Sequence, residues 1–406
     1  MKKTLLLIII LLIQNIIYPK TIISEIEVIG NQKTRSEVIL GIARVKVGDE
    51  FNEDILKNIK RYLDNQRKFE EVEVKAEKLS EDNVKIIIRV KDKWSIILLP
   101  YFAYKNENTS FGLVFIESNL FGYQNSIVIS PIYENKKINF FTLFSHPRVK
   151  NSLFSYVIGA SRLYKDIDIF DMNSVIDNFS QDSYGGFITL KYQFYGEHYI
   201  MWSNYNYYYK IVKEPYIEKG KNSFTRLFLK LDWTNYDGYY CEGNYLGLFY
   251  EKDLWFSDIK RSITGLKFES FINPYKRQNI YIAFNMFHTF KIDNFFEETI
   301  GQDATFYVGP LRGYKKYQIR TETAITNNIE YRIPLAKVFS TDFLVVPFFD
   351  SAYWKEKSNN WRLDYSTGIS LRFFINKVII PAMELYFAYG LVYKEYAIGF
   401  MIGGRL

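Results

Sequence analysis

The sequence has few of the residues from which covalent or metal-bound scaffolds are built. One cysteine, Cys241, among 406 residues excludes an internal disulfide framework and any site with several cysteine ligands. The three histidines, His146, His198 and His288, are scattered, which argues against a histidine-based zinc site. The net charge of +7 is too small to indicate nucleic acid as a partner. We therefore expect no cofactor, no metal and no nucleic acid.

Long apolar runs are absent beyond the N-terminus. Leu5–Ile13 is an unbroken apolar run behind Lys2 and Lys3. It is too short for a membrane helix of about 20 residues and typical of a secretory signal peptide. We predict that residues 1–20 are a signal peptide, with an uncleaved membrane anchor as the alternative. No later stretch reaches 18 consecutive apolar residues, so a bilayer-spanning mature chain would have to form a closed β-barrel.

Aromatic residues are scarce in one part of the mature chain and abundant in the other. Residues 21–92 contain 3 aromatics in 72 positions, about 4%, together with 14 basic and 15 acidic residues. Residues 93–406 contain 70 aromatics in 314 positions, about 22%. We predict a small soluble domain at 21–92 and a second domain of different chemistry at 93–406.

The small domain reads as strand, helix, helix, strand, strand. The first strand ends at the turn signal Gly30-Asn31, and Thr34 with Glu37 gives a capping-box pattern for the first helix. The second helix is predicted to begin at Asn52, and the last two strands near Phe69 and Val84.

This order and several landmark residues resemble a POTRA domain over residues 21–92. The landmarks are Val28-Ile29-Gly30-Asn31, Gly48, Leu63 and Phe69-Glu70-Glu71-Val72. The alternative for this segment is a generic small α+β domain.

The second domain alternates apolar and polar residues with a period of two. Clear examples are 188–194, 226–233, 369–373 and 383–391. Membrane barrels show this alternation of lipid-facing and lumen-facing residues, and abundant Tyr and Phe are typical of interfacial girdles. We predict a mostly β protein with a 16-stranded antiparallel transmembrane β-barrel; a soluble β-sandwich is the alternative. The expected fifth to eighth strands are 152–161, 185–195, 199–210 and 224–233.

Four motifs follow in order behind the POTRA-like domain. They are Glu117-Ser118-Asn119-Leu120-Phe121-Gly122, Gly309-Pro310-Leu311-Arg312-Gly313-Tyr314, Asn328-Ile329-Glu330-Tyr331-Arg332 and Phe348-Phe349-Asp350-Ser351-Ala352. In this order they resemble the BamA/TamA-type outer-membrane assembly superfamily, also called the bacterial surface antigen family. The resemblance spans residues 21–406.

The resemblance implies that Arg312-Gly313-Tyr314 form the tip of a sixth extracellular loop that folds back into the lumen. Arg312 would there contact Asp350 and Glu330. The family's aspartate motif usually ends in glycine, and Ala352 stands in its place here, which leaves the curvature of that strand open.

The residues themselves also place both carboxylates in the lumen. Glu330 and Arg332 share one face of their strand, and Ile329 and Tyr331 share the other. A carboxylate facing lipid is costly, so Glu330 and Asp350 are predicted to point inward, where an arginine fork can bind both. The alternative is a solvated Arg312 above a wet pore lined by the two acids.

A lateral seam is predicted between the first strand, about 96–105, and the last, about 395–406. Pro100 cannot donate a ladder hydrogen bond, and Gly403-Gly404 lack side chains that would stabilise pairing. The resemblance implies opening at this place. If Pro100 preceded the first strand, the seam would be intact.

No enzyme signature is present: the sequence lacks Gly-x-Ser-x-Gly, a phosphate loop and a dinucleotide fingerprint. The resemblance implies an outer-membrane barrel whose periplasmic POTRA domain receives unfolded outer-membrane or secreted polypeptides by strand addition. Expected partners are these clients, outer-membrane lipid and periplasmic accessory proteins. The alternatives are a passive barrel, porin or surface antigen, and a dedicated polypeptide secretion pore.

Overall fold

A computed structural model describes most of the mature chain. The described residues are 21–105, 108–134, 137–148, 152–171, 174–290, 298–302, 304–315, 318–355, 360–378 and 382–402. The chain divides into two compact units between Asp92 and Lys93. The predicted signal peptide lies outside the described residues. Within the described ranges, no helix is long and apolar enough to cross a membrane.

The N-terminal unit packs two helices against a three-stranded sheet. Strands β1 (Ile22–Ile29), β3 (Asn83–Asp92) and β2 (Phe69–Lys78) lie in that order, with β1 parallel and β2 antiparallel to β3. Helices α2 (Ser36–Ala43) and α3 (Glu53–Asp64) cover one face of the sheet. The aliphatic core between them includes Val38, Ile39, Ile42, Ile59, Leu63, Ile86 and Ile88.

The two helix starts differ. Asn52 caps α3 as predicted, since its side chain accepts a hydrogen bond from the Ile55 N–H at 3.0 Å. The predicted capping box at Thr34 is wrong: Arg35 is the N-cap of α2, and the Thr34 hydroxyl instead donates to Asp92 at the end of β3. Asp92 also accepts from the Thr34 backbone N–H, so the loop before α2 is tied to the sheet.

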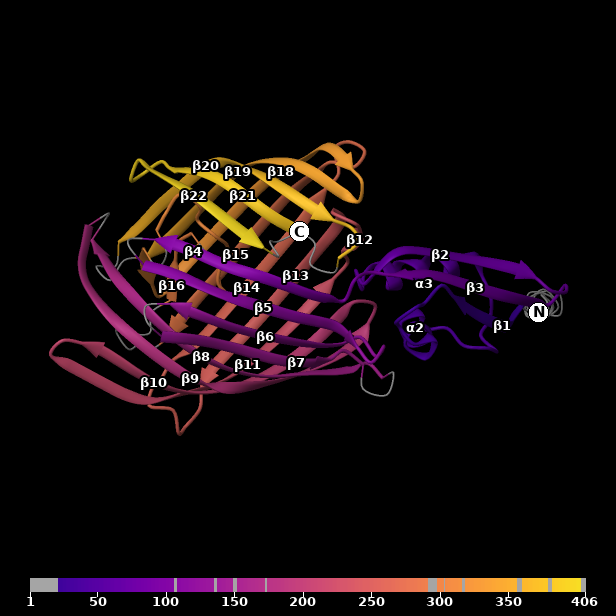
Figure 1. Cartoon of the computed structure of the whole chain (residues 1–406), viewed down its shortest axis with the longest axis horizontal. Coiled ribbons are helices and arrows are strands. Elements are labelled where there is room, and N and C mark those ends of the chain that lie inside the picture. The colour runs from indigo at the N-terminus through magenta and orange to yellow at the C-terminus, as the bar shows by residue number, and fades with distance from the viewer. Residues whose placement is uncertain are drawn as a thin grey trace, which may run out of the picture. The chain divides into compact units, whose positions relative to one another are not determined.

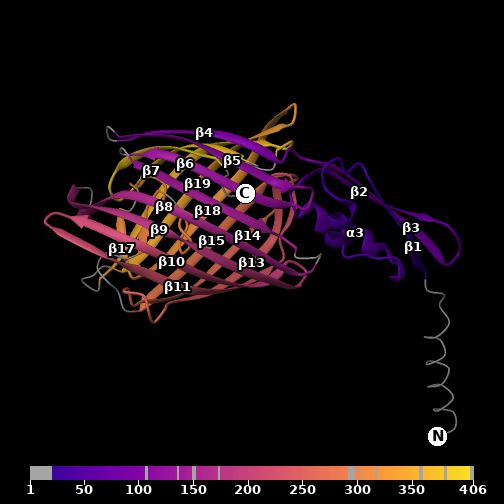
Figure 2. The same ribbon diagram turned by 60° about the horizontal axis from the view of Figure 1, so that its bottom comes forward.

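The C-terminal unit is a closed antiparallel β-barrel (Figures 1 and 2). Strand β12 continues β11, because both pair with β13, so the wall has the predicted 16 passes. Its strands are β4 (Ile96–Lys105), β5 (Asn108–Leu120), β6 (Asn125–Glu134), β7 (Lys137–His146), β8 (Phe154–Asp171), β9 (Ser174–Tyr195), β10 (His198–Lys213), β11 (Tyr216–Asp232), β12 (Asn235–Asp237), β13 (Tyr240–Asp253), β14 (Ser262–Ile272), β15 (Asn279–Phe290), β18 (Thr323–Val338), β19 (Thr341–Lys355), β20 (Trp361–Ile375), β21 (Ala382–Gly390) and β22 (Glu395–Ile402).

Side chains on the wall alternate between an apolar outer face and a polar inner face. On β20, Ile369 and Leu371 are exposed on the outside, while Ser370 and Arg372 are buried inside. Tyr353 and Trp361 stack on the outer surface, with ring centroids 4.6 Å apart. This is the distribution expected for a wall with lipid on one side.

Strands β8 to β11 are longer than the sequence pattern predicts. They contain 18, 22, 16 and 17 residues, whereas about 9–11 residues cross a bilayer. In Figure 1 these strands reach beyond the rest of the wall. The prediction ended early because, beyond the apolar band, apolar residues change to the inner face, where Phe179 of β9 and Ile211 of β10 belong to one buried cluster.

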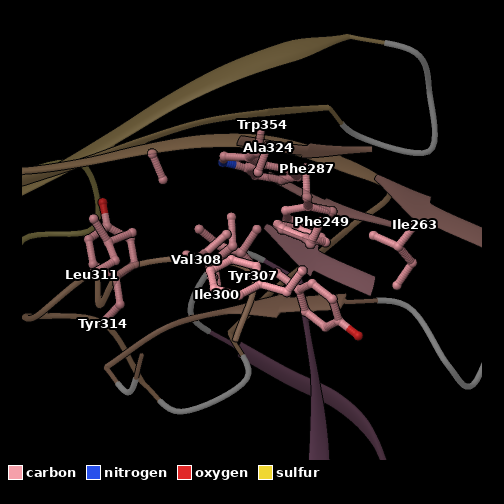
Figure 3. Packing of buried hydrophobic residues seen from close by; sticks show 13 residues of the cluster. Phe249, Ile263, Phe287, Ile300, Tyr307, Val308, Leu311, Tyr314, Ala324 and Trp354 are labelled. Atoms are coloured by element: carbon pink, nitrogen blue, oxygen red, sulfur yellow. The ribbon is translucent and has the colours of Figure 1, made fainter. Parts of the chain in front are cut away.

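The longest connection of the wall, residues 291–322 between β15 and β18, is the sixth loop. Its ends pair as a two-stranded sheet of β16 (Glu298–Ile300) and β17 (Ile319–Thr321). Between them, apolar loop residues pack against the inner wall (Figure 3). The loop contributes Ile300, Tyr307, Val308, Leu311, Tyr314 and Ile319, and the wall contributes Phe228, Phe249, Ile263, Phe287, Ala324, Ala352 and Trp354.

Candidate functional site

Arg312, at the tip of the sixth loop, is 1% exposed and lies against the inner wall. Its Nε and Nη2 atoms donate to the two oxygens of Asp350 on β19, at 2.8 and 2.7 Å. Its backbone N–H donates to the same carboxylate at 3.1 Å. The guanidinium carbon lies 3.5 Å from the ring centroid of Phe348. The structure therefore brings Arg312 and Asp350 into a buried bidentate pair.

Glu330 on β18 is shared by three arginines. It accepts hydrogen bonds from Arg312 at 3.0 Å, from Arg332 at 3.0 Å and from Arg372 at 2.7 Å. Arg372 also donates to Glu384 on β21 at 3.0 Å. Sequence reasoning missed Arg372 and Glu384, although the alternation of their strands places both on the inner face.

These buried charges form one balanced group, which we call the loop lock. Three guanidinium groups face three carboxylates, so the formal charges within the group cancel. The members are Arg312, Arg332, Arg372, Glu330, Asp350 and Glu384. Buried ion pairs are costly to break because one partner is left uncompensated, so this group can hold the loop tip at one place. In the described part of the chain, no group of His, Cys, Asp and Glu residues could hold a metal ion.

The two residues after Arg312 fit closely against the wall. Gly313 has φ +95°, and a Cβ atom there would lie 2.7 Å from the backbone nitrogen of Gly390 on β21. Only glycine combines this backbone conformation with such an approach. The Tyr314 hydroxyl donates to Asp364 at 3.0 Å, and Asp364 also accepts from the Trp354 indole N–H. Gly313 and Tyr314 thus extend the contact from β19 to β20 and β21.

A second polar contact, absent from the sequence-based prediction, holds the other arm of the loop. The Tyr307 hydroxyl donates to Glu251 on β13 at 2.9 Å, and Glu251 is fully buried. Arg226 on β11 donates to Glu251 at 2.6 Å and to the Tyr307 oxygen at 3.2 Å. Arg261 donates to Glu298 of the loop at 3.0 Å. We call these five residues the second anchor.

Pro100 lies inside β4, opposite Leu113 of β5. The Ser118 N–H donates to the Ser95 carbonyl at 3.0 Å, and Ser95 continues the β4 register by one residue. In an antiparallel sheet, the backbone N–H and C=O of one residue bond the strand on one side, and those of the next residue bond the strand on the other side. Pro100, five residues from Ser95, therefore faces away from β5 and toward β22, the other neighbour of β4. The backbone N–H that proline lacks would have pointed toward β22, where the barrel closes.

The last strand exposes its outer side chains more than its neighbour does. Tyr396, Ile398 and Phe400 on β22 are 70%, 73% and 59% exposed, whereas Leu385 and Phe387 on β21 are 44% and 45% exposed. The three β22 side chains are therefore less covered than the two on β21. The predicted seam residues Gly403 and Gly404 lie outside the described residues.

Both units of the chain are similar to known proteins. Residues 21–93 match the POTRA family, described as "Surface antigen variable number repeat". Over 161 residues the chain is 29% identical to the outer membrane protein assembly factor BamA of Nitratidesulfovibrio vulgaris. That match covers 39% of this chain and 20% of the relative, so the chain spans about a fifth of that protein.

Solved structures share the fold across nearly the whole chain. BamA from Haemophilus ducreyi lacking POTRA domains 1–3 has a TM-score of 0.56 at 14% identity, covering 94% of this chain and 84% of that one. CdiB from Acinetobacter baumannii has a TM-score of 0.61 at 13% identity, with coverage of 95% and 74%. CdiB from Escherichia coli has a TM-score of 0.67 at 10% identity, with coverage of 95% and 76%. The chain is thus similar to the BamA/TamA-type family, through its POTRA domain and through the fold of its barrel; the barrel lies in the outer membrane and the POTRA domain in the periplasm.

Proposed function

We propose that this protein assists the insertion of unfolded polypeptides into the outer membrane, through a lateral seam between β4 and β22. The observation that carries the proposal is the chemistry of the two closing strands. Pro100 lacks a donor on the side of β4 that faces β22. The outer side chains of β22 are also poorly covered. A closure that lacks one ladder donor and leaves outer side chains exposed is one that a client strand can replace. Consistent with this role, the Nitratidesulfovibrio vulgaris relative is named an assembly factor for outer-membrane proteins.

The sixth loop favours this role over that of a passive pore. A porin needs an open lumen, whereas here a long loop lies against the inner wall. It is held by the loop lock and by the second anchor.

The POTRA domain supplies an edge that can receive a client strand. On one side of the sheet, β1 is covered: the Ile23 N–H donates to the Asp49 carbonyl at 2.9 Å, and the Gly48 N–H to the Ile23 carbonyl at 2.8 Å. Strand β2 is at the opposite edge. The Lys75 ammonium, hydrogen-bonded to Glu73 on β2, holds the pKa of that carboxyl below its usual range. An extended client segment adding to β2 would thus meet a charged, hydrated edge.

Depletion of the protein from its native cells tests the proposed activity. Outer membranes are collected as the protein declines, and their proteins are quantified by mass spectrometry. Loss of many barrel proteins is the expected result. Loss of a single exported protein would instead indicate a dedicated secretion pore. An unchanged inventory would indicate a passive barrel and overturn the proposal.

Cross-linking tests the seam separately. In a Cys241→Ala background, a cysteine at Leu98 of β4 is combined in turn with one at each outer position of β22, and the pair that oxidises is kept. Oxidation is expected to stop rescue of depleted cells, and reduction to restore it. The matched control is a disulfide between Leu371 and Leu385, which face each other across β20 and β21. Full rescue by the oxidised seam variant would rule out lateral opening.

A further inference from the structure

The outer face of the β8–β11 sheet carries a group of exposed cations that the proposed activity does not use. Strand β4 follows the periplasmic POTRA domain, so the β8–β9 and β10–β11 turns lie on the extracellular side. Near these turns, Arg162, Tyr184, Tyr208 and Lys221 form one cross-strand row. Lys210 and Lys219 pair in the next row outward. Residues opposite each other point to the same side of a sheet.

We call five of these cations the basic band: Lys137, Arg162, Lys210, Lys219 and Lys221. All five are exposed. The Lys137 ammonium lies 3.6 Å from the ring centroid of Tyr164, which joins it to the same surface. Two acidic residues on this surface are already engaged. Asp182 pairs with Arg162 at 3.0 Å, and Asp166 accepts hydrogen bonds from Tyr164 and Ser180.

The band lies where the apolar face of the wall ends. On β9, the exposed aromatics Phe194 and Tyr184 are ten residues apart. At about 3.3 Å per residue and a tilt of about 40°, ten residues span about 25 Å, the height of the apolar band of an outer-membrane barrel. Between them, Ile188 and Leu190 face outward. Tyr184 therefore marks the outer interface, and Tyr184 and Tyr208 stack there with centroids 5.6 Å apart.

We propose that the basic band binds the phosphate-bearing headgroups of anionic lipids in the outer leaflet. Stacked tyrosines fix this face at the interface, and the cations project just beyond them, at the depth of lipid phosphates. Lysine near an anionic membrane surface contributes about 1 kcal/mol, a factor of about five in affinity. The long β8–β11 strands would then anchor one side of the barrel in the leaflet.

Lipid selectivity measured by electron spin resonance tests the band. The full-length protein is reconstituted with phosphatidylcholine, and spin-labelled phosphatidylglycerol is compared with spin-labelled phosphatidylcholine for the motionally restricted fraction at the protein. Wild type is expected to favour phosphatidylglycerol, less so in high salt. The variant K210Q/K219Q/K221Q should lower that preference at least threefold. The control K33Q/K57Q/K78Q makes the same charge change on exposed POTRA lysines and should leave the preference intact.

Three results would overturn the proposal. The first is a wild type without preference for phosphatidylglycerol. The second is an equal loss of preference in the POTRA control, which would mean that net charge alone is measured. The third is an unchanged preference in the triple band variant, which would show that these lysines do not carry the lipid preference. Gel mobility before and after heating checks that each variant keeps a folded barrel.

Discussion

Arg312→Ala is expected to loosen the sixth loop and destabilise the barrel by about 3–5 kcal/mol, the cost of breaking a buried ion pair. The substitution removes two side-chain hydrogen bonds to Asp350 and one to Glu330. The substitution leaves the two carboxylates with different numbers of cationic partners. Glu330 keeps Arg332 and Arg372, whereas fully buried Asp350 keeps no cationic partner among the residues that the structure describes.

The remaining partners of Asp350 limit the loss. The Asn328 amide donates to Asp350 at 2.8 Å, and the backbone N–H at position 312 donates at 3.1 Å. Arg312→Lys should therefore cost less than Arg312→Ala, because it keeps the charge but loses the fork. Asp350→Asn should cost about as much as Arg312→Ala. The double variant should cost about 2 kcal/mol or more below the sum, because each single change already breaks the same pair.

Urea unfolding in lipid vesicles, followed by tryptophan fluorescence, measures these differences. All six tryptophans lie at positions 94–361, in the barrel unit, so the signal does not report on the POTRA domain. Lys213→Ala is the matched control: its pair with Asp177 is partly exposed and lies outside the basic band, and such pairs contribute at most about 1 kcal/mol. It should add independently to Arg312→Ala. Effects of Arg312→Ala and Asp350→Asn that sum to within about 0.5 kcal/mol would refute the loop lock.

Three further changes test other parts of the molecule. Tyr307→Phe should destabilise the barrel by about 1–3 kcal/mol in the same assay, because buried Glu251 loses a donor; an unchanged midpoint would remove the second anchor. Gly313→Ala should be more destabilising than Gly196→Ala, since both have positive φ but only the Cβ at 313 would meet backbone; equal losses would show that the close approach is unimportant. Protease added to intact cells should spare residues 21–92, and cleavage there would reverse the assigned topology.

The alternation of single strands predicted which residues line the lumen but not how they combine. Glu330 and Asp350 could be assigned to the inner face because charge on the lipid side is costly. The same reasoning applies to Arg372 and Glu384, but their contact depends on the register between β20 and β21, where they stand opposite each other. Register follows from turn geometry and packing across strands, which a single sequence does not reveal.

The second anchor was beyond prediction for a different reason. Tyr307 and Glu251 are 56 positions apart, and neither belongs to a motif. Their contact exists because the apolar residues of the sixth loop pack against β13 to β15 and bring the hydroxyl to the carboxylate. The extensions of β8 to β11 also escaped prediction, because there the apolar residues, such as Phe179 and Ile211, lie on the inner face instead of the outer face.

The two holding points of the loop also bear on where the barrel can open. The loop lock joins the loop to β18, β19, β20 and β21, and the second anchor joins it to β11 and β13. Both sets of bonds brace the wall from β11 to β21. The bond from the loop to β22 is weaker: Lys315 reaches Glu395 at 3.4 Å, and both side chains are partly exposed. A braced wall resists separation between its own strands. The seam proposed above, between β22 and β4, lies outside this braced part, at the place where Pro100 lacks a hydrogen-bond donor.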